Sequence, residues 1–510
     1  MYQFNKIIDL AITLKKYNDA FRYIQLAKSR SLSERLFIDN LLPLGAPARL
    51  YDEYMRFRNI KEQLTSTLLS GNKQKLRNSF SEWLNASRSY RDMLEKLKRY
   101  DPEFVFLVAD QTADSLELSD AIQRCPDETL LVDVFITSKK TILFLISSEF
   151  DAAKCVITIP EINCNTFNEL FNKVIEMPQN RYETQKQLLH AFDEAYYPIL
   201  STLNELLMPK LENTIEKIRL KRIIFLPHRE LHLLPLHLLI QKSGKYLCET
   251  YEVSFAPNIS ILINYLNRNE YKKPNHILVV ENPDNSLIFA TPEALSVKSI
   301  FPRTTRLIRG DATKQNVKSM IKYVDAIHFI THGNFSDCDI QKINLVLSDG
   351  ELSFEEIIGN YRFRSCDFAF LSACETGKIK LDEGDEYIGM NHAFMYAGSK
   401  TVISSLWAVD DMSTMLFVYR WYHNYITNGM HKVASLREAQ LWLKNAKWDE
   451  IITFIGNDEI AKKISEYRIE RYQRCLPVHV ALSSNIEYEK EKPFEHPFYW
   501  APFCCYGDWS

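Results

Sequence analysis

Several strand-length segments of this sequence are apolar throughout, without the polar alternation of a strand that has one face in solvent. Two of them lie within the stretches VDAIHFITHG, at 324–333, and CDFAFLSACETG, at 366–377. Strands of this kind are buried on both faces, as in a parallel sheet that helices cover on each side. We therefore predict a largely parallel sheet in an α/β fold of three layers.

Further elements of this sheet are predicted from about residue 101 onward. The segment TLLVDVFITSKKTILFLISS predicts two strands joined by a turn at Ser138–Lys140. Buried strands are also predicted at Ile223–Leu226 and within NHILVVENP, at 275–283. A helix is predicted over 290–301, where Thr291, Pro292 and Glu293 mark its start. Residues that follow the carboxyl ends of parallel strands line the ligand crevice of such a sheet.

The first hundred residues are helical by pattern. In YNDAFRYIQLAKSRSLSERL, residues Ala20, Ile24, Ala27 and Ser31 follow the spacing of one helix face. Proline and glycine interrupt this pattern in LLPLGAPARL, at 41–50, and two long amphipathic helices are predicted after it. We expect an α-helical N-terminal cap in which a helical hairpin packs on the next domain.

Composition and charge exclude several classes of function. The 510 residues carry a formal net charge of −3, which does not favour a nucleic-acid or membrane partner. No apolar run reaches the length of about 18 residues that a membrane helix needs, and the N-terminus is too polar for a signal peptide, so we expect a cytoplasmic protein. The sequence has no dinucleotide-binding or P-loop motif. Its ten cysteines are scattered, without a C-x-x-C pair, and we expect no metal and no cofactor.

Two of the predicted strands end in a similar way. One ends at His332–Gly333 and the other at Cys374, and the two residues are 42 positions apart (374 − 332). A crossover between parallel strands needs about a dozen residues or more. If the two strands are neighbours, His332 and Cys374 project from the same edge of the sheet.

A histidine and a cysteine at one sheet edge suit thiol catalysis. A free thiol is mostly protonated at neutral pH, so a histidine must accept its proton or hold the thiolate. The amides of Gly333 and Cys374 are the candidate donors for the oxyanion of an acyl-transfer intermediate. A buried cysteine that acts as a small hydrophobic residue, beside a structural histidine, fits the pattern equally well.

An ordered series of motifs resembles the CHAT family of caspase-like proteins, which are relatives of separase within the caspase-fold cysteine peptidases. Together the motifs cover nearly all of 101–510. They include RIIFLPHRELHLLPLHLL, ETYEVSFAPN, DAIHFITHGNF, LSDGELSFEEI, FAFLSACETG, EGDEYIGMNHAFMYAGSKTVISSLWAVDD, SLREAQLWL and HPFYWAPFCCYG, preceded by AFRYIQLAKSRSLSERL in the N-terminal region.

The resemblance implies a caspase-like three-layer α/β/α fold with two tandem halves, of which the first is degenerate. It divides the chain into a helical region at 1–100, a degenerate half at 101–255 and a catalytic half at 256–510. It also implies a cysteine endopeptidase with His332 as the base and Cys374 as the nucleophile. The helix pattern of the N-terminal region is similar to the end of a tetratricopeptide repeat array, which typically precedes CHAT domains.

The substrate pocket has two interpretations. Separase-like relatives place an acidic residue after the LW segment to hold a basic P1 side chain, and SLWAVDD offers Asp410 and Asp411 at this place. Alternatively, one of the two aspartates is the N-cap of the helix that follows. The acidic segment KLDEGDEYIG, at 380–389, is either a solvated loop or a loop that gates the cleft.

Two other candidate residues have structural explanations. His392, in MNHAFMYAG, is predicted to pack inside a helix, and Cys338 lies in a polar loop without a strand to hold it as a nucleophile.

We expect a protein substrate and an activating or inhibitory protein partner that acts through the N-terminal helices, in a stress, immunity or cell-death pathway. The alternatives are a catalytically silent CHAT scaffold for protein–protein interaction and a hydrolase that acts on small substrates.

Overall fold

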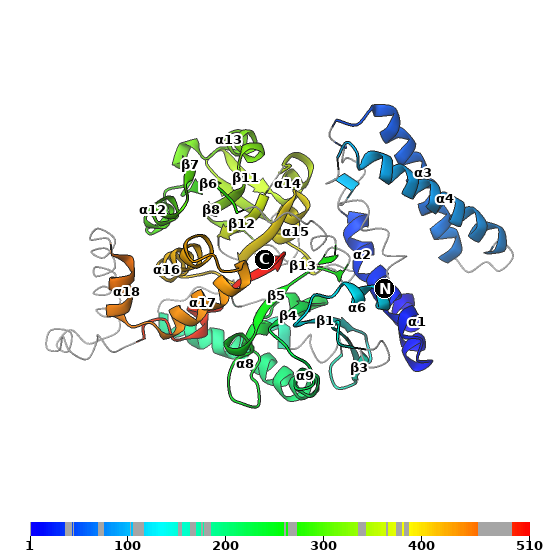
Figure 1. Cartoon of the computed structure of the whole chain (residues 1–510), viewed down its shortest axis with the longest axis horizontal. Helices are drawn as coiled ribbons and strands as arrows, with labels where there is room; N and C mark the ends of the chain where they lie inside the picture. The colour runs from blue at the N-terminus through cyan, green and yellow to red at the C-terminus, as the bar shows by residue number, and fades with distance from the viewer. Residues whose placement is uncertain are drawn as a thin grey trace.

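The fold is described from a computed structural model of the chain (Figure 1). The structure describes residues 2–35, 43, 45–69, 76–101, 104–105, 117–150, 156–163, 170–174, 177, 185–259, 262–263, 273–334, 343–363, 366–373, 380–381, 387–456 and 492–510.

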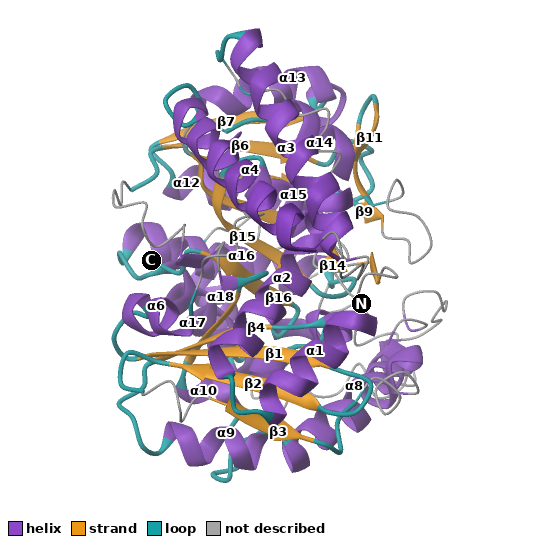
Figure 2. Ribbon diagram, turned by 90° about the vertical axis from the view of Figure 1, so that its right-hand side faces the viewer, coloured by secondary structure: helices purple, strands orange, loops and turns teal. Residues whose placement is uncertain are grey.

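One continuous mixed sheet runs through the described part of the chain (Figure 2). Its eleven strands have the order β3-β2-β1-β4-β5-β16-β15-β12-β8-β6-β7. Their bounds are β1 Thr129–Ile136, β2 Thr141–Ile146, β3 Val156–Ile159, β4 Arg222–Leu226, β5 Glu252–Phe255, β6 His276–Glu281, β7 Arg303–Ile308, β8 Ala326–Ile330, β12 Cys366–Ser372, β15 Ser399–Ser405 and β16 Phe503–Gly507. The predicted turn at 138–140 joins β1 to the antiparallel β2.

The strands from β15 to β7 are all parallel, as the apolar segments predict. β12 pairs with β15 on one side and with β8 on the other, and β6 lies between β8 and β7. Every residue of β6, β8 and β12 is buried. Because the carboxyl ends of these strands meet at one edge, the residues that follow β6, β8 and β12 can form a single site.

Helices cover this part of the sheet on two faces. Phe370 of β12 packs on Trp421 of α16, whereas Phe329 of β8 packs on Phe394 of α15, so the two helices lie on opposite sides. The bounds of the helices in this region are α12 Ala290–Ile300, α13 Lys314–Met320, α14 Phe354–Asn360, α15 Met390–Tyr396, α16 Asp411–Tyr422, α17 Lys432–Asn445 and α18 Trp448–Ile455. The three-layer α/β architecture predicted from the sequence is therefore confirmed.

The strands β1 to β5 have their own helices. These are α6 Leu118–Arg124, α8 Gln185–Leu206 and α9 Met208–Ile215. Phe192 of α8 packs edge-on against Trp407, which follows β15, so α8 also contacts the other part of the sheet. The predicted boundary at 255–256 falls where β5 ends. Since β16 from the C-terminal region pairs with both β5 and β15, the two proposed halves share one sheet, and the boundary itself stays a prediction.

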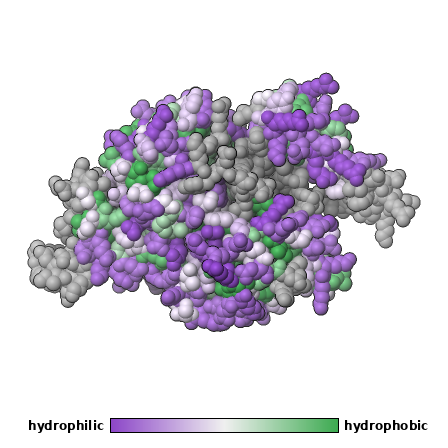
Figure 3. Space-filling view, in the orientation of Figure 1, coloured by the Kyte–Doolittle hydropathy of each residue, from purple (hydrophilic) through white to green (hydrophobic). Residues whose placement is uncertain are grey.

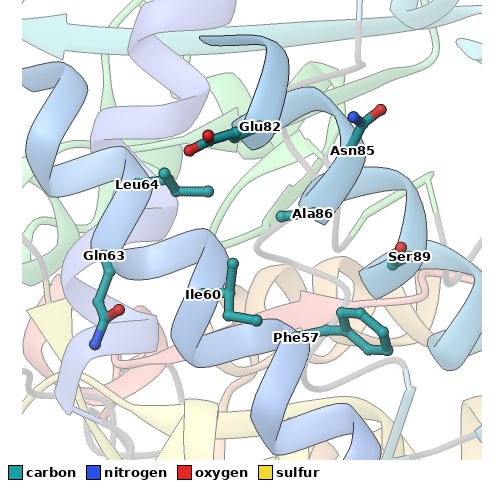
Figure 4. Close-up of a pocket in the computed structure, with 8 residues that line it drawn as sticks. All are labelled: Phe57, Ile60, Gln63, Leu64, Glu82, Asn85, Ala86 and Ser89. Atoms are coloured by element: carbon teal, nitrogen blue, oxygen red, sulfur yellow. The ribbon is translucent and has the colours of Figure 1, made fainter. Parts of the chain in front are cut away.

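The N-terminal region forms two helix pairs. The helices are α1 Tyr2–Thr13, α2 Tyr17–Arg35, α3 Ala48–Leu69 and α4 Leu76–Leu97. α3 and α4 pack side by side, and a groove of about 520 Å³ opens between them, with Phe57 and Leu64 on one side and Ala86 on the other (Figure 4). The face of the molecule in Figure 3 is mostly hydrophilic, with scattered apolar residues, as on most soluble domains.

The helix α2 is fixed to the sheet by a buried ion pair. Lys28 Nζ lies 2.5 Å from Asp133 Oδ1 of β1 and donates to the carbonyls of Leu226 and Pro227 at the end of β4. Phe21 of the same helix packs on Phe144 of β2. The buried ammonium is compensated by a carboxylate and two carbonyl oxygens, so the helix has one defined position on the sheet.

Removing one partner of this pair should destabilise the protein strongly. We expect Lys28→Met to lower the free energy of unfolding by about 3–5 kcal/mol, because it leaves the buried Asp133 carboxylate without its cation. Urea denaturation measures the loss. The control is Lys140→Met, which breaks the more exposed pair with Asp9 and should cost about 0–1 kcal/mol. Equal losses in the two variants would contradict the assignment of Lys28 as the anchor of α2.

Candidate active site

His332 lies two residues after the end of β8, at the carboxyl edge of the parallel strands. Its side chain is 37% exposed, which leaves the imidazole accessible from solvent. The Nε2 atom lies 2.7 Å from Ser286 Oγ and 3.8 Å from Asp284 Oδ2. The strand end predicted from the sequence therefore holds a histidine with polar neighbours at one of its ring nitrogens.

Both neighbours of His332 belong to the loop that follows β6. β6 pairs directly with β8, so the polar residues after its end reach the histidine from the adjacent strand. Sequence reasoning missed Asp284 and Ser286. The signal was present, because the segment NPDNS follows a buried strand in the same way as the other two strand ends, but only the pairing of β6 with β8 identifies its target.

Cys374 lies outside the described residues, and so do Cys338 and the acidic segment at 382–386. The register of the two strands nevertheless defines where the chain leaves the sheet. Ser372, the last residue of β12, pairs with Ile330, the last residue of β8. His332 and Cys374 each follow these paired residues by two positions in the sequence, an arrangement that the 42-residue spacing allowed.

The residue before Cys374 is held by a buried hydrogen bond. The Ser405 hydroxyl, at the end of β15, donates to the carbonyl of Ala373 at 2.9 Å. Ser405 is fully buried. The neighbouring strand therefore fixes the backbone as far as Ala373, the last described residue before Cys374.

The amide of Gly333 points away from its pairing strand. Gly333 opens β9 Gly333–Asn334, an edge strand that pairs with β10 Asn344–Leu347. The Val346 amide donates to the His332 carbonyl, which makes Gly333 and Leu345 a non-hydrogen-bonded pair. The N–H of Gly333 therefore faces away from β10, as an oxyanion donor must.

The two aspartates after β15 have different roles in the structure. Asp410 is the N-cap of α16, where its side chain accepts the Ser413 amide at 2.9 Å. The Asp411 carboxylate accepts the amide of Phe289 at 3.0 Å, at the end of the loop that carries Ser286. Burial raises the pKa of Asp411 to about 6. The N-cap interpretation is correct for Asp410, and a role of either aspartate in substrate binding stays a prediction.

Four of the five described cysteines are poor candidates for a nucleophile, and the fifth, Cys125, is also buried. Burial raises the pKa of Cys248, Cys366 and Cys505 to about 12, and that of Cys504 well above its usual value. His392 is buried in α15, where desolvation lowers its pKa to about 4, so its predicted packing role is confirmed. Within the described ranges no group of His, Cys, Asp and Glu could hold a metal ion, and no helix is long and apolar enough to cross a membrane.

A second histidine occupies the corresponding place in the first half. His228 follows β4 by two residues, as His332 follows β8. It is buried against the ring of Phe135, and its Nδ1 accepts the amide of Ile136 at 3.0 Å. Burial, and then the charge of Lys28, lower its pKa well below 6.5. This strand end therefore carries a histidine that is enclosed by the fold, in contrast to the partly exposed His332.

The sequence matches the CHAT domain family model over residues 198–508. This range is more than half of the chain, which therefore belongs to the CHAT family. A search of curated proteins gave no match. Separase of Saccharomyces cerevisiae, in its complex with securin, is 11% identical with a TM-score of 0.45, and the match covers 83% of this chain and 39% of separase. Gingipain R, an Arg-specific cysteine proteinase, is 10% identical with a TM-score of 0.37, over 68% of this chain and 75% of gingipain.

The raised pKa of Asp411 predicts a pH-dependent stability. The pKa of this carboxyl is about 6 in the folded state and 3.8 in the unfolded chain, so its ionisation destabilises the folded state. The destabilisation is fully present above pH 6 and is lost as the pH falls toward 3.8. We expect the free energy of unfolding of Asp411→Asn to be about 1–2 kcal/mol higher than that of wild type at pH 8, because the variant has no buried charge. The oxygen of the new side-chain amide still accepts the Phe289 amide.

Urea denaturation of both proteins at several pH values measures this difference, which should shrink steadily between pH 6 and pH 4. Asp449→Asn is the control, because this carboxylate is exposed in the first turn of α18. A difference that does not vary with pH would show that Asp411 is not the titrating group.

Proposed function

We propose that this protein is a cysteine endopeptidase that uses His332 and Cys374 to cleave a protein substrate. The observation that supports the proposal is the pairing of Ser372 with Ile330, from which the two residues follow at equal distances along the chain. Membership of the CHAT family agrees with this chemistry.

The proposed reaction follows from the chemistry of a thiol beside an imidazole. His332 accepts the proton of the Cys374 thiol, and the thiolate attacks the carbonyl carbon of the peptide bond. The amides of Gly333 and Cys374 stabilise the oxyanion of the tetrahedral intermediate. The imidazolium then gives its proton to the leaving amine, and a thioester remains. Water, activated by His332, hydrolyses the thioester and restores the thiol.

Control by a partner is part of the proposal. A protease that is permanently active in the cytoplasm would damage its cell, so we propose that a protein partner, acting through the N-terminal helices, switches this one in a stress, immunity or cell-death pathway. The buried contact of Lys28 with Asp133 supports a connection between these helices and the sheet. Full activity of the purified protein without any partner would contradict this part of the proposal.

An electrophilic peptide probe tests the dyad. We expect a peptidyl acyloxymethyl ketone to label the activated protein covalently, because its electrophilic carbon traps a thiolate at the active site. Labelling, read from the intact mass, should be lost in Cys374→Ala and His332→Ala and retained in the control Cys338→Ala. Absence of labelling under every partner condition would favour the scaffold interpretation instead.

The P1 preference tests the two aspartates separately. If Asp411 holds a basic P1 side chain, Asp411→Ala should reduce kcat/KM for cleavage after Arg or Lys by about 10-fold or more relative to neutral P1 residues. Asp410→Ala removes a helix cap and should lower stability by about 1 kcal/mol in addition to any such effect. A peptide library with each P1 residue measures the preference, and an unchanged profile in both variants would remove both residues from the pocket.

A further inference from the structure

The direction of the hydrogen bonds at His332 is determined by the serine between the histidine and the aspartate. The Ser286 hydroxyl has one hydrogen, and it donates this hydrogen to Asp284 Oδ1 at 2.8 Å, since an ionised carboxylate can only accept. The contact of 2.7 Å with His332 is therefore a bond in which Nε2–H donates to Ser286 Oγ. In the neutral ring this leaves Nδ1 without a hydrogen and able to accept one.

The loop that carries these residues is fixed at both ends. The Asn282 amide donates to the carbonyl of Ile330, two residues before His332, at 2.8 Å. The side chain of Asn282 also makes two hydrogen bonds to the backbone of Leu287, at 3.0 and 3.1 Å. At the other end, Asp411 holds the Phe289 amide. The loop is therefore tied to the same strand that positions His332.

Two backbone torsion angles of this loop lie in a region that few residues adopt. Asn282 and Asn285 have φ values of 46° and 61°, in the left-handed region that asparagine tolerates better than most residues. The two residues shape the turn that brings Ser286 back toward β8. Because a strained conformation persists only where the surrounding contacts determine it, the hydrogen bonds of Asn282 are consistent with a preorganised loop.

We infer that Ser286 and Asp284 are positioning residues that hold His332 in the Nε2–H tautomer, so that Nδ1 accepts the thiol proton. The inference rests on the proposed function for its role in catalysis. When Nδ1 takes the proton, the imidazolium keeps its bond to Ser286, and the carboxylate of Asp284 lies 3.8 Å from Nε2. No atom of either residue meets the substrate in this scheme.

The tautomer of His332 tests the inference without any peptide substrate. We expect ¹⁵N spectra of histidine-labelled protein at about pH 8 to show His332 protonated at Nε2. The resonance is assigned by its loss in His332→Gln. In Ser286→Ala the Nε2–H population should fall toward the mixture of an unconstrained imidazole, and Ser286→Thr, which keeps the hydroxyl, should restore it. A dominant Nδ1–H tautomer in wild type would overturn the inference.

Measurements of kcat and KM then distinguish whether Ser286 and Asp284 position His332 or bind the substrate. We expect Ser286→Ala and Asp284→Asn to lower kcat by about 10- to 100-fold with KM unchanged, because only the proton transfer is affected. Asp311→Asn is the matched control, as this aspartate is exposed in the short 3-10 helix that follows the neighbouring strand β7. If Ser286→Ala alters the tautomer of His332 but keeps the wild-type rate, the role of Ser286 in catalysis is overturned. A correct tautomer in a protein that no probe labels would instead contradict the proposed peptidase function.

Discussion

The parallel pairing of β8 with β12 is the interaction on which the proposed site depends. It aligns Ile330 with Ser372, so that the two strands end side by side. The aromatic side chains of the two strands bury both faces against α15 and α16. A change of register by one residue would turn these side chains to the opposite faces and would also displace the two strand ends. The packing that stabilises the sheet therefore also determines the geometry at its edge.

The sequence was sufficient for the parts of the molecule that repeat a simple pattern. Continuous apolar strands predicted the parallel sheet, and the two similar strand ends indicated that residues 332 and 374 would lie at the same sheet edge if their strands were neighbours. Interactions between distant segments could not be predicted in this way. The approach of Ser286 to His332 depends on β6 being the second neighbour of β8, and the insertion of Lys28 beside Asp133 depends on where α2 packs. The pattern of polar residues in the sequence does not show which of them are neighbours in space.

The aspartates after β15 illustrate the same limit at closer range. Two adjacent carboxylates, which the sequence left equivalent, have different environments because a helix starts between them. The Asp410 carboxylate accepts an amide in the first turn of α16, and the Asp411 carboxylate accepts an amide of the loop after β6. One carboxylate therefore stabilises a helix, and the other connects α16 to the loop that contacts the histidine. A change of charge at Asp411 would be transmitted to this loop through the backbone amides of Ile288 and Phe289.

The position of β16 has a consequence for synthesis on the ribosome. This strand lies between β5 and β15, although about 250 residues separate it from β5 in the chain. Until residues 503–507 emerge, β5 and β15 are both open edges, and Ala373 is bonded to a strand that lacks one neighbour. A nascent chain that already contains the histidine and the cysteine would thus not yet have a complete sheet to align them. The order of synthesis therefore delays completion of the sheet, and of the edge that carries His332, until β16 has been made.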